Sequence, residues 1–200
     1  MTDKRAVIII PTLDVLAAAA TCALAQETAG FSCGAVIVVE EQRRGAVIPR
    51  NAGLAAALAQ GPAYIVHLDT DAHVTQDGWL ARMVEALESD PLYGLAAASG
   101  TCRSNPQSKG VPGMEKGITV VAHPLAGFCQ VIKTEVCRQV GLYDTNLIHY
   151  SLESDFSMRA RELGWQEIWV QDVYVQHEHA PKIEDWWAHD RAYYKRKWAR

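Results

Sequence analysis

Two aspartates separated by one residue follow an apolar run near the middle of the chain. Residues 64–68 are apolar apart from His67, and Asp69-Thr70-Asp71 comes directly after them. A turn at this point can bring both carboxylates together to hold a hard cation such as Mg²⁺ or Mn²⁺, while substrate phosphates complete its shell. An aspartate at a strand end can also cap a helix or form a turn, so the meaning of the motif depends on its surroundings.

The segments around this motif alternate between strand-like and helix-like composition. Short runs rich in β-branched residues have the length of strands buried on both faces, and they occupy residues 6–10, 35–39 and 64–68. Ala- and Leu-rich stretches follow them and predict helices at residues 13–26, 51–60 and 79–87. This alternation predicts an α/β fold with a mostly parallel central sheet flanked by helices.

The second half of the chain has a different character. Residues 100–117 are rich in Gly, Pro, Ser and Lys, so we expect a long loop of the kind that is usually functional or disordered. Strands are predicted on either side of it, at residues 95–98, 128–132 and 167–175. Helices are predicted at residues 134–140, 152–163 and 184–200. With 200 residues, we expect one domain, residues 1–200.

Polar groups follow three of the predicted strands. In open α/β sheets, ligands bind beyond the carboxyl ends of the strands. The first strand runs into Pro11-Thr12, the second into Glu40-Glu41, and the third into Asp69-Thr70-Asp71. One carboxylate at this edge can accept hydrogen bonds from a base or a ribose, and two can chelate a metal. The pattern favours a site for a charged ligand at this edge of the sheet.

Composition excludes several other classes of protein. The net charge of -4 is unlike that of nucleic-acid binders, which are usually basic. The five cysteines are scattered without a C-x-x-C pair, which argues against a disulfide framework or a structural zinc site. No apolar stretch is long enough to cross a bilayer, and no signal-peptide cleavage pattern follows the N-terminus. We therefore expect a cytoplasmic protein with reduced thiols.

Six segments, taken in order, resemble the family 2 type of GT-A glycosyltransferases. They are residues 7–12, 36–41, 49–54, 67–71, 127–144 and 153–161. The segment at 49–54 matches the family's A-R-N-x-G pattern, 67–71 matches L-D-x-D, and 153–161 resembles E-D-x-D-x-x-x-R. The sequence departs from the family at Glu40-Glu41, where an Asp pair is usual, and at Glu153, which replaces an Asp. A collinear set of this kind is far more specific than any one motif.

The resemblance implies a GT-A fold and a donor site in residues 1–99. Asp69 and Asp71 would hold a divalent cation, Mn²⁺ or Mg²⁺, that bridges the diphosphate of a nucleotide sugar, with Thr70 between them. Glu40 would lie at the base, and Arg50 would touch the base or the phosphates. Pro11 and Thr12 would line the same pocket through backbone groups. The donor implied is a nucleotide-diphosphate sugar, with a UDP-sugar favoured and a GDP- or dTDP-sugar as alternatives.

The same resemblance places acceptor binding and catalysis in residues 100–183. Glu153 matches the family's catalytic carboxylate and is the candidate general base of an inverting hexosyltransferase, with Asp155 as its rival. Asp155 and Arg159 are also spaced to form an ion pair at i and i+4 on a helix. His177 matches a family histidine near the metal, with His179 as the alternative. The acceptor is unknown, a glycan or a protein, and it can dock over the loop at 100–117.

Aromatic and basic residues alternate in the last segment, residues 184–200. Three interpretations stand beside each other: an interfacial helix on a membrane, an aromatic wall for a sugar or an acceptor, and a helix that packs its aromatic residues on the core. The resemblance of the tail to other family members favours the last or an acceptor-side role. Two alternatives to the transferase also remain: a non-catalytic relative that binds nucleotide sugars, and a sugar nucleotidyltransferase, which usually has a Gly-rich loop after the first strand.

Overall fold

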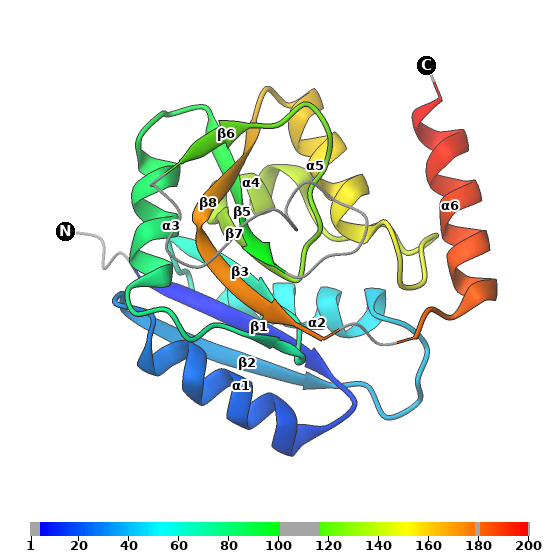
Figure 1. The fold of residues 1–200 in the computed structure, drawn as a ribbon. Helices are drawn as coiled ribbons and strands as arrows, with labels where there is room; N and C mark the ends of the chain where they lie inside the picture. The colour runs from blue at the N-terminus through cyan, green and yellow to red at the C-terminus, as the bar shows by residue number, and fades with distance from the viewer. Residues whose placement is uncertain (1–4, 101–116, 179–180, 200) are drawn as a thin grey trace.

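The chain forms a central sheet with helices on both faces (Figure 1). The computed structural model describes residues 5–100, 117–178 and 181–199. The strands are β1 (Ala6–Thr12), β2 (Cys33–Val39), β3 (Tyr64–Leu68), β4 (Ala72–His73), β5 (Tyr93–Gly100), β6 (Ile118–Val120), β7 (Cys129–Lys133) and β8 (Gln166–His177). The helices are α1 (Val15–Glu27), α2 (Val47–Ala59), α3 (Trp79–Glu88), α4 (Thr134–Val140), α5 (Leu152–Glu162) and α6 (Glu184–Trp198).

The sheet is mixed, and its order is β2-β1-β3-β7-β5-β8-β4, with β6 also paired to β8. The neighbours β2, β1 and β3 are parallel to one another. β7 runs against both β3 and β5, β8 runs parallel to β5, and the short strands β4 and β6 run against β8. Among the described strands β1, β2, β3, β5 and β8 therefore share one direction. The parallel strands bring their carboxyl ends to one edge, as the sequence predicts.

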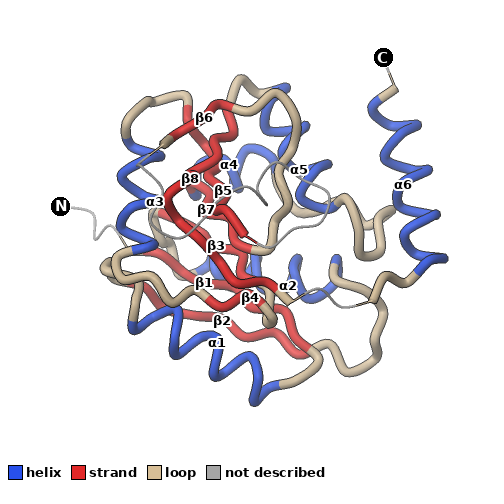
Figure 2. The backbone as a smooth tube through the Cα atoms, viewed as in Figure 1, coloured by secondary structure: helices blue, strands red, loops and turns tan. Residues whose placement is uncertain are grey.

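Alternate residues of β1 serve two different cores, because successive side chains of a strand point to opposite faces. Ile8 and Ile10 pack with residues of α1 and α3 on one face. Val7 and Ile9 pack with residues of α2, α4 and α5 on the other. All of these β1 side chains are fully buried. This explains why the run is continuously apolar and confirms the predicted α/β fold with a sheet between two helical layers (Figure 2).

Two helices begin at different residues from those predicted. The Asp14 carboxylate caps α1 by accepting the N–H groups of Leu16 and Ala17, so the helix starts at Val15 rather than at 13. α2 starts at Val47, four residues before the predicted 51. Pro49 fits within its first turn, because N–H groups there have no partner inside the helix. As a result Arg50 belongs to a helix rather than to the segment before one.

The structure also contains strands that the sequence did not predict. β4 is two residues long and β6 is three, which is too short to give a periodic pattern. β8 is longer than predicted at both ends and contains a bulge: Ala98 pairs with Val170, but the next residue of β5, Ser99, pairs with Tyr174. Beyond the bulge, β8 continues to His177. None of the helices within the described ranges has the length and apolar composition needed to cross a bilayer.

Candidate active site

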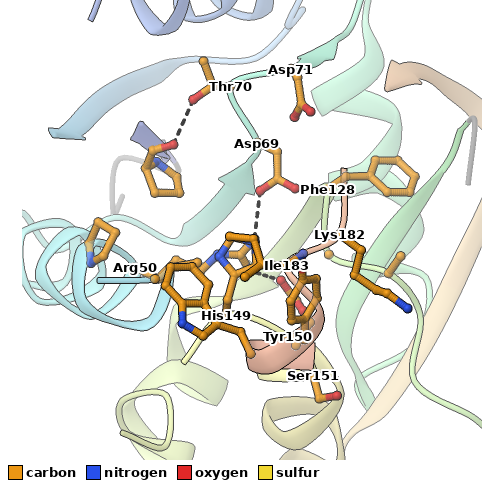
Figure 3. A pocket seen from close by; sticks show the side chains of 18 of the residues that line it. Arg50, Asp69, Thr70, Asp71, Phe128, His149, Tyr150, Ser151, Lys182 and Ile183 are labelled. Atoms are coloured by element: carbon orange, nitrogen blue, oxygen red, sulfur yellow. Dashed lines mark hydrogen bonds and ion pairs between the residues drawn. The ribbon is translucent and has the colours of Figure 1, made fainter. Parts of the chain in front are cut away.

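A pocket of about 1320 Å³ opens at the carboxyl ends of β1, β2 and β3. Its floor includes seven of the residues singled out in the sequence, which are Pro11, Thr12, Glu40, Arg50, Asp69, Thr70 and Asp71. Its other walls come from three later segments, at residues 124–128, 149–154 and 181–187, and from His177. Figure 3 shows Asp69 and Arg50 pointing toward each other within this pocket, joined by a hydrogen bond. The pocket therefore joins residues from both halves of the chain.

Asp69, Asp71 and His177 form the acidic cluster of the pocket. One ligand atom from each lies within 4.8 Å of the others. Backbone pairing brings them together, because Ala72 of β4 pairs with His177 of β8 and the Glu178 N–H donates to the Asp71 carbonyl. The Asp69 N–H donates to the carbonyl of Phe128 at 2.9 Å, which holds Asp69 beside the start of β7.

The donor atoms of this cluster suit a divalent cation. Two carboxylates and one imidazole are a set that Mn²⁺ accepts, with open positions for phosphate oxygens. His177 Nε2 lies 3.3 Å from Asp71 Oδ1 and 3.8 Å from Asp69 Oδ2, so all three groups already face one another. The imidazole stacks on the Phe128 ring, with centroids 4.9 Å apart. Burial disfavours the charged imidazole, but the Asp71 hydrogen bond and the charges of both carboxylates outweigh it and raise the pKa of His177.

Arg50 links this cluster to Glu153. The guanidinium is almost fully buried and donates to Asp69 Oδ1 at 2.8 Å with one nitrogen and to Glu153 with another. Burial opposes its charge, but the two carboxylates outweigh this and raise the pKa of Arg50, so it stays protonated. Burial also raises the pKa of Asp69, against the opposing effect of Arg50. Arg50 thus lies beside these two carboxylates in the pocket, and its predicted contact with a base or phosphates stays a prediction.

The opposite end of the floor consists of Pro11, Thr12 and Glu40. The Glu40 N–H donates to the Thr12 carbonyl at 2.9 Å, which keeps the ends of β1 and β2 together. The buried Glu40 carboxylate accepts hydrogen bonds from Arg44, and these lower its pKa. Thr70 Oγ1 donates to the Pro11 carbonyl at 2.8 Å and so ties the acidic turn to the end of β1. These residues form one continuous surface with Asp69 and Asp71.

Glu153 and Asp155 lie in different surroundings, although only one residue separates them on α5. Glu153 lines the pocket and meets Arg50 there. Asp155 is 1% exposed, is not among the residues lining the pocket, and accepts hydrogen bonds from Arg159, Trp198 and, in an ion pair, Lys197. The i, i+4 pair of Asp155 with Arg159 therefore forms as the spacing predicts. Asp155 joins α5 to α6, while Glu153 faces the space where a substrate can bind.

Other pocket residues were not singled out as site residues. Gly127 permits the close approach of Glu153, because a Cβ at this position would overlap the Glu153 side chain. The sequence indicates Gly127 only through its position as the first residue of the family-like segment 127–144. Nothing in the sequence indicates that Phe128 would stack on His177, or that His149 and Tyr150 would line the pocket. His179 and almost all of the loop predicted at 100–117 lie outside the described residues.

Sequence comparison decides the family. The model of glycosyl transferase family 2 matches residues 18–130, which is more than half of the chain. The chain belongs to glycosyl transferase family 2. The match extends from α1 into β7 and includes Glu40, Arg50, Asp69 and Asp71, in agreement with the family expected from the sequence motifs. No curated protein matches this family 2 chain.

Solved structures of low sequence identity share the fold. GalNAc-T7, in a crystal structure with UDP, GalNAc and Mn²⁺, is 15% identical, with a TM-score of 0.67 over 90% of this chain. This chain spans only 45% of that protein. A197 from STIV is 12% identical, with a TM-score of 0.58, over 88% of this chain and 86% of A197. The catalytic domain of Drosophila β1,4-galactosyltransferase 7, in complex with xylobiose, is 17% identical, with a TM-score of 0.57. The match covers 88% of this chain and 71% of that one. These likenesses confirm the predicted GT-A fold.

Proposed function

We propose that this family 2 domain is a metal-dependent glycosyltransferase that moves a sugar from a nucleotide-diphosphate sugar to an acceptor hydroxyl. The observation that carries the proposal is the convergence of Asp69, Asp71 and His177 in the same pocket as Glu153. Structural neighbours support it, because the GalNAc-T7 structure contains UDP, GalNAc and Mn²⁺. In this assignment residues 1–99 bind most of the donor, and residues 100–183 supply the base and most of the acceptor surface.

Asp69, Asp71 and His177 would hold the divalent cation, Mn²⁺ or Mg²⁺. When bound, such a cation stabilises the negative charge that develops on a departing diphosphate. Glu40 lies at the far end of the pocket floor, where its buried carboxylate suits the hydrogen-bond donors of a base or ribose. Pro11 and Thr12 line the space between, and the uracil of a UDP-sugar is the base that we favour there.

Glu153 is the proposed general base. As the acceptor oxygen attacks the anomeric carbon, a bond forms between them and the bond from that carbon to the diphosphate oxygen breaks. The proton of the acceptor hydroxyl passes to the Glu153 carboxylate. Attack from the face opposite the leaving group inverts the anomeric centre. Because Asp155 is enclosed by Arg159, Lys197 and Trp198, its position favours Glu153 for this role.

Arg50 is the proposed positioning residue between donor and base. Its hydrogen bonds to Asp69 and Glu153 fix both carboxylates relative to the anomeric carbon. When the acceptor binds, the contact between Arg50 and Glu153 must loosen enough to leave a carboxylate oxygen of Glu153 for the acceptor hydroxyl.

The test is incubation with Mn²⁺ or Mg²⁺ and a panel of UDP-, GDP- and dTDP-sugars, with measurement of nucleoside diphosphate release. We expect metal-dependent release, fastest with a UDP-sugar, and its loss on addition of a chelator. Metal-dependent nucleotide binding without release would instead identify a non-catalytic nucleotide-sugar-binding protein. Release of pyrophosphate from a nucleoside triphosphate and a sugar 1-phosphate would identify a nucleotidyltransferase.

A further inference from the structure

α6 is anchored to the pocket wall at two points of one helical face. Asp190, which is fully buried, accepts the N–H groups of Ile148, His149 and Tyr150 at 2.8–3.0 Å. Just before the helix begins, the Ile183 N–H donates to the Tyr150 hydroxyl at 2.8 Å. Positions three and four residues apart lie on one face of a helix. Trp186 and Trp187 both lie between these anchors at such spacings, and the ring contact with His149 shows that Trp186 faces the wall formed by residues 148–150.

Trp186 presents an aromatic face within the candidate active site. Its ring lies 5.7 Å from that of His149, and both residues line the pocket, as do Ser151 and Ser154. The next residue, Trp187, has its ring engaged by cations, with Lys182 Nζ at 3.8 Å from the centroid and the Arg191 guanidinium at 4.8 Å. Trp187 also lines the pocket, but Lys182 and Arg191 already cover its ring, so Trp186 is the better candidate for stacking a ligand.

The pocket is larger than one small ligand requires. Pockets for a single small molecule are usually about 300–1,000 Å³, and this one is about 1320 Å³. The donor assignment uses the end with Glu40, Asp69 and Asp71, which leaves the end with Trp186, His149 and the two serines. Glu153 connects the two ends of the pocket: it precedes Ser154 in the chain, and it contacts Arg50, which also contacts Asp69.

We propose that the Trp186 end is a subsite for a saccharide acceptor, with one sugar ring stacked on the indole. This inference rests on the proposed function, because it assigns the acceptor of that transferase. The C–H face of a sugar ring is apolar and carries partial positive charge, which suits the negative face of an indole. The hydroxyls at the ring edge suit Ser151, Ser154 and His149 as hydrogen-bond partners. The stacked ring directs one hydroxyl to Glu153.

The test uses saturation-transfer NMR with methyl glycosides of glucose, galactose, N-acetylglucosamine and N-acetylgalactosamine. Each is measured on the full chain alone and with Mn²⁺ and UDP. We expect at least one glycoside to bind, and Trp186→Ala to weaken its binding about tenfold or more, the effect of losing about 1.4 kcal/mol. Trp186→Phe keeps an aromatic face and should retain most of the affinity. Trp165→Phe, at a tryptophan bonded to Gln139 outside the pocket, is the control.

The same glycosides are then added as acceptors to the nucleoside diphosphate assay. The binding glycoside should accelerate release, and Trp186→Ala should raise its KM more than it lowers kcat. If glycosides bind through Trp186 but no nucleotide sugar is turned over, the subsite stands and the transferase assignment fails. A Ser-containing peptide is tested as an acceptor in parallel. If turnover is stimulated by the peptide and by none of the glycosides, or if glycoside affinity is the same in Trp186→Ala, the saccharide subsite is wrong.

Discussion

The floor of the pocket and its opposite wall are held in place by different forces. The floor lies at the ends of β1, β2 and β3, where the buried side chains of β1 and β3 and the hydrogen bonds between the three strands leave the turn at Asp69 few alternatives. The wall at residues 148–154 consists of a loop and the first turn of α5, so the hydrogen bonds of a strand pair do not hold its backbone. Instead, three carboxylates bind it to α6: Asp144 through Tyr193 and Lys197, Asp155 through Trp198, and Asp190 through three backbone N–H groups.

This contrast indicates a division of labour. A sheet edge gives carboxylates a position that depends little on any one side chain, which suits the proposed site for a metal and a donor. A wall held by a few side chains can change through single substitutions, which suits the variable acceptor. Substitutions of Asp69 or Asp71 in the floor should therefore have the largest effect on the chemistry. Substitutions in the wall, apart from those that change or displace Glu153, should alter the efficiency of the reaction or the stability of the chain.

Asp71→Ala should have the largest effect. It removes one of three groups in the acidic cluster, and a catalytic cation contributes several kcal/mol to stabilising the leaving group, so turnover should fall about 1,000-fold. Calorimetric titration with Mn²⁺ should show the loss of binding directly. The control Asp77→Ala changes an exposed aspartate outside this pocket and should bind Mn²⁺ as the original chain does. Unchanged Mn²⁺ affinity in Asp71→Ala would falsify the metal assignment.

Glu153→Gln should be next in size and should separate the two regions. The amide cannot take the acceptor proton, so kcat should fall about 100- to 1,000-fold. Affinity for Mn²⁺ and nucleotide should change little, because Asp69, Asp71 and His177 remain. Steady-state kinetics with titration of the donor would measure both. Glu135→Gln, at an exposed position on α4, is the control. A variant that loses nucleotide affinity but keeps kcat would place Glu153 in donor binding instead.

Gly127→Ala should perturb Glu153 without changing its chemistry. The added methyl group would overlap the Glu153 side chain and displace the carboxylate, and a shift of about 1 Å in a catalytic group can cost about 100-fold in rate. We expect kcat to fall about 10- to 100-fold while Mn²⁺ still binds. Gly34→Ala on β2 is a matched control, since a Cβ there meets no atom within 4 Å. Equal kcat in the two variants would show that Glu153 needs no such room.

The contrast also explains which features the sequence predicted. The three parallel strands and Asp69-Thr70-Asp71 were predictable because their signals are local, an apolar run followed by polar residues. The contact of Arg50 with Glu153 was not, since these two residues are 103 positions apart in the chain. The same holds for the contact of Asp190 with Ile148, 42 residues away. Short strands such as β4, which aligns His177 with Asp71, carry no periodic signal of their own.

Asp190→Asn should have the smallest effect on the chemistry and a clear effect on stability. The amide nitrogen cannot accept the hydrogen bonds that one carboxylate oxygen of Asp190 now accepts from backbone N–H groups. The free energy of unfolding at pH 7 should therefore fall by about 1.5–3 kcal/mol. Activity should fall only several-fold, through a looser wall and a higher acceptor KM, with Mn²⁺ affinity kept. Chemical denaturation would measure the stability change. Asp185→Asn, an exposed position in the first turn of α6, is the control.

The pH dependence of this difference tests its cause. Burial alone would raise the pKa of Asp190, but the hydrogen bonds from His149, His189, Tyr150 and Ile148 outweigh it and lower the pKa in the folded chain. The folded state therefore binds the proton less readily than the unfolded state, so the stabilisation is complete above the unfolded pKa of about 3.9 and is lost as the pH falls through the folded pKa. The stability gap between the original chain and Asp190→Asn should accordingly be constant near neutrality and narrow in acid. A gap that stays constant down to the acid transition would mean that α6 is held by packing rather than by this carboxylate.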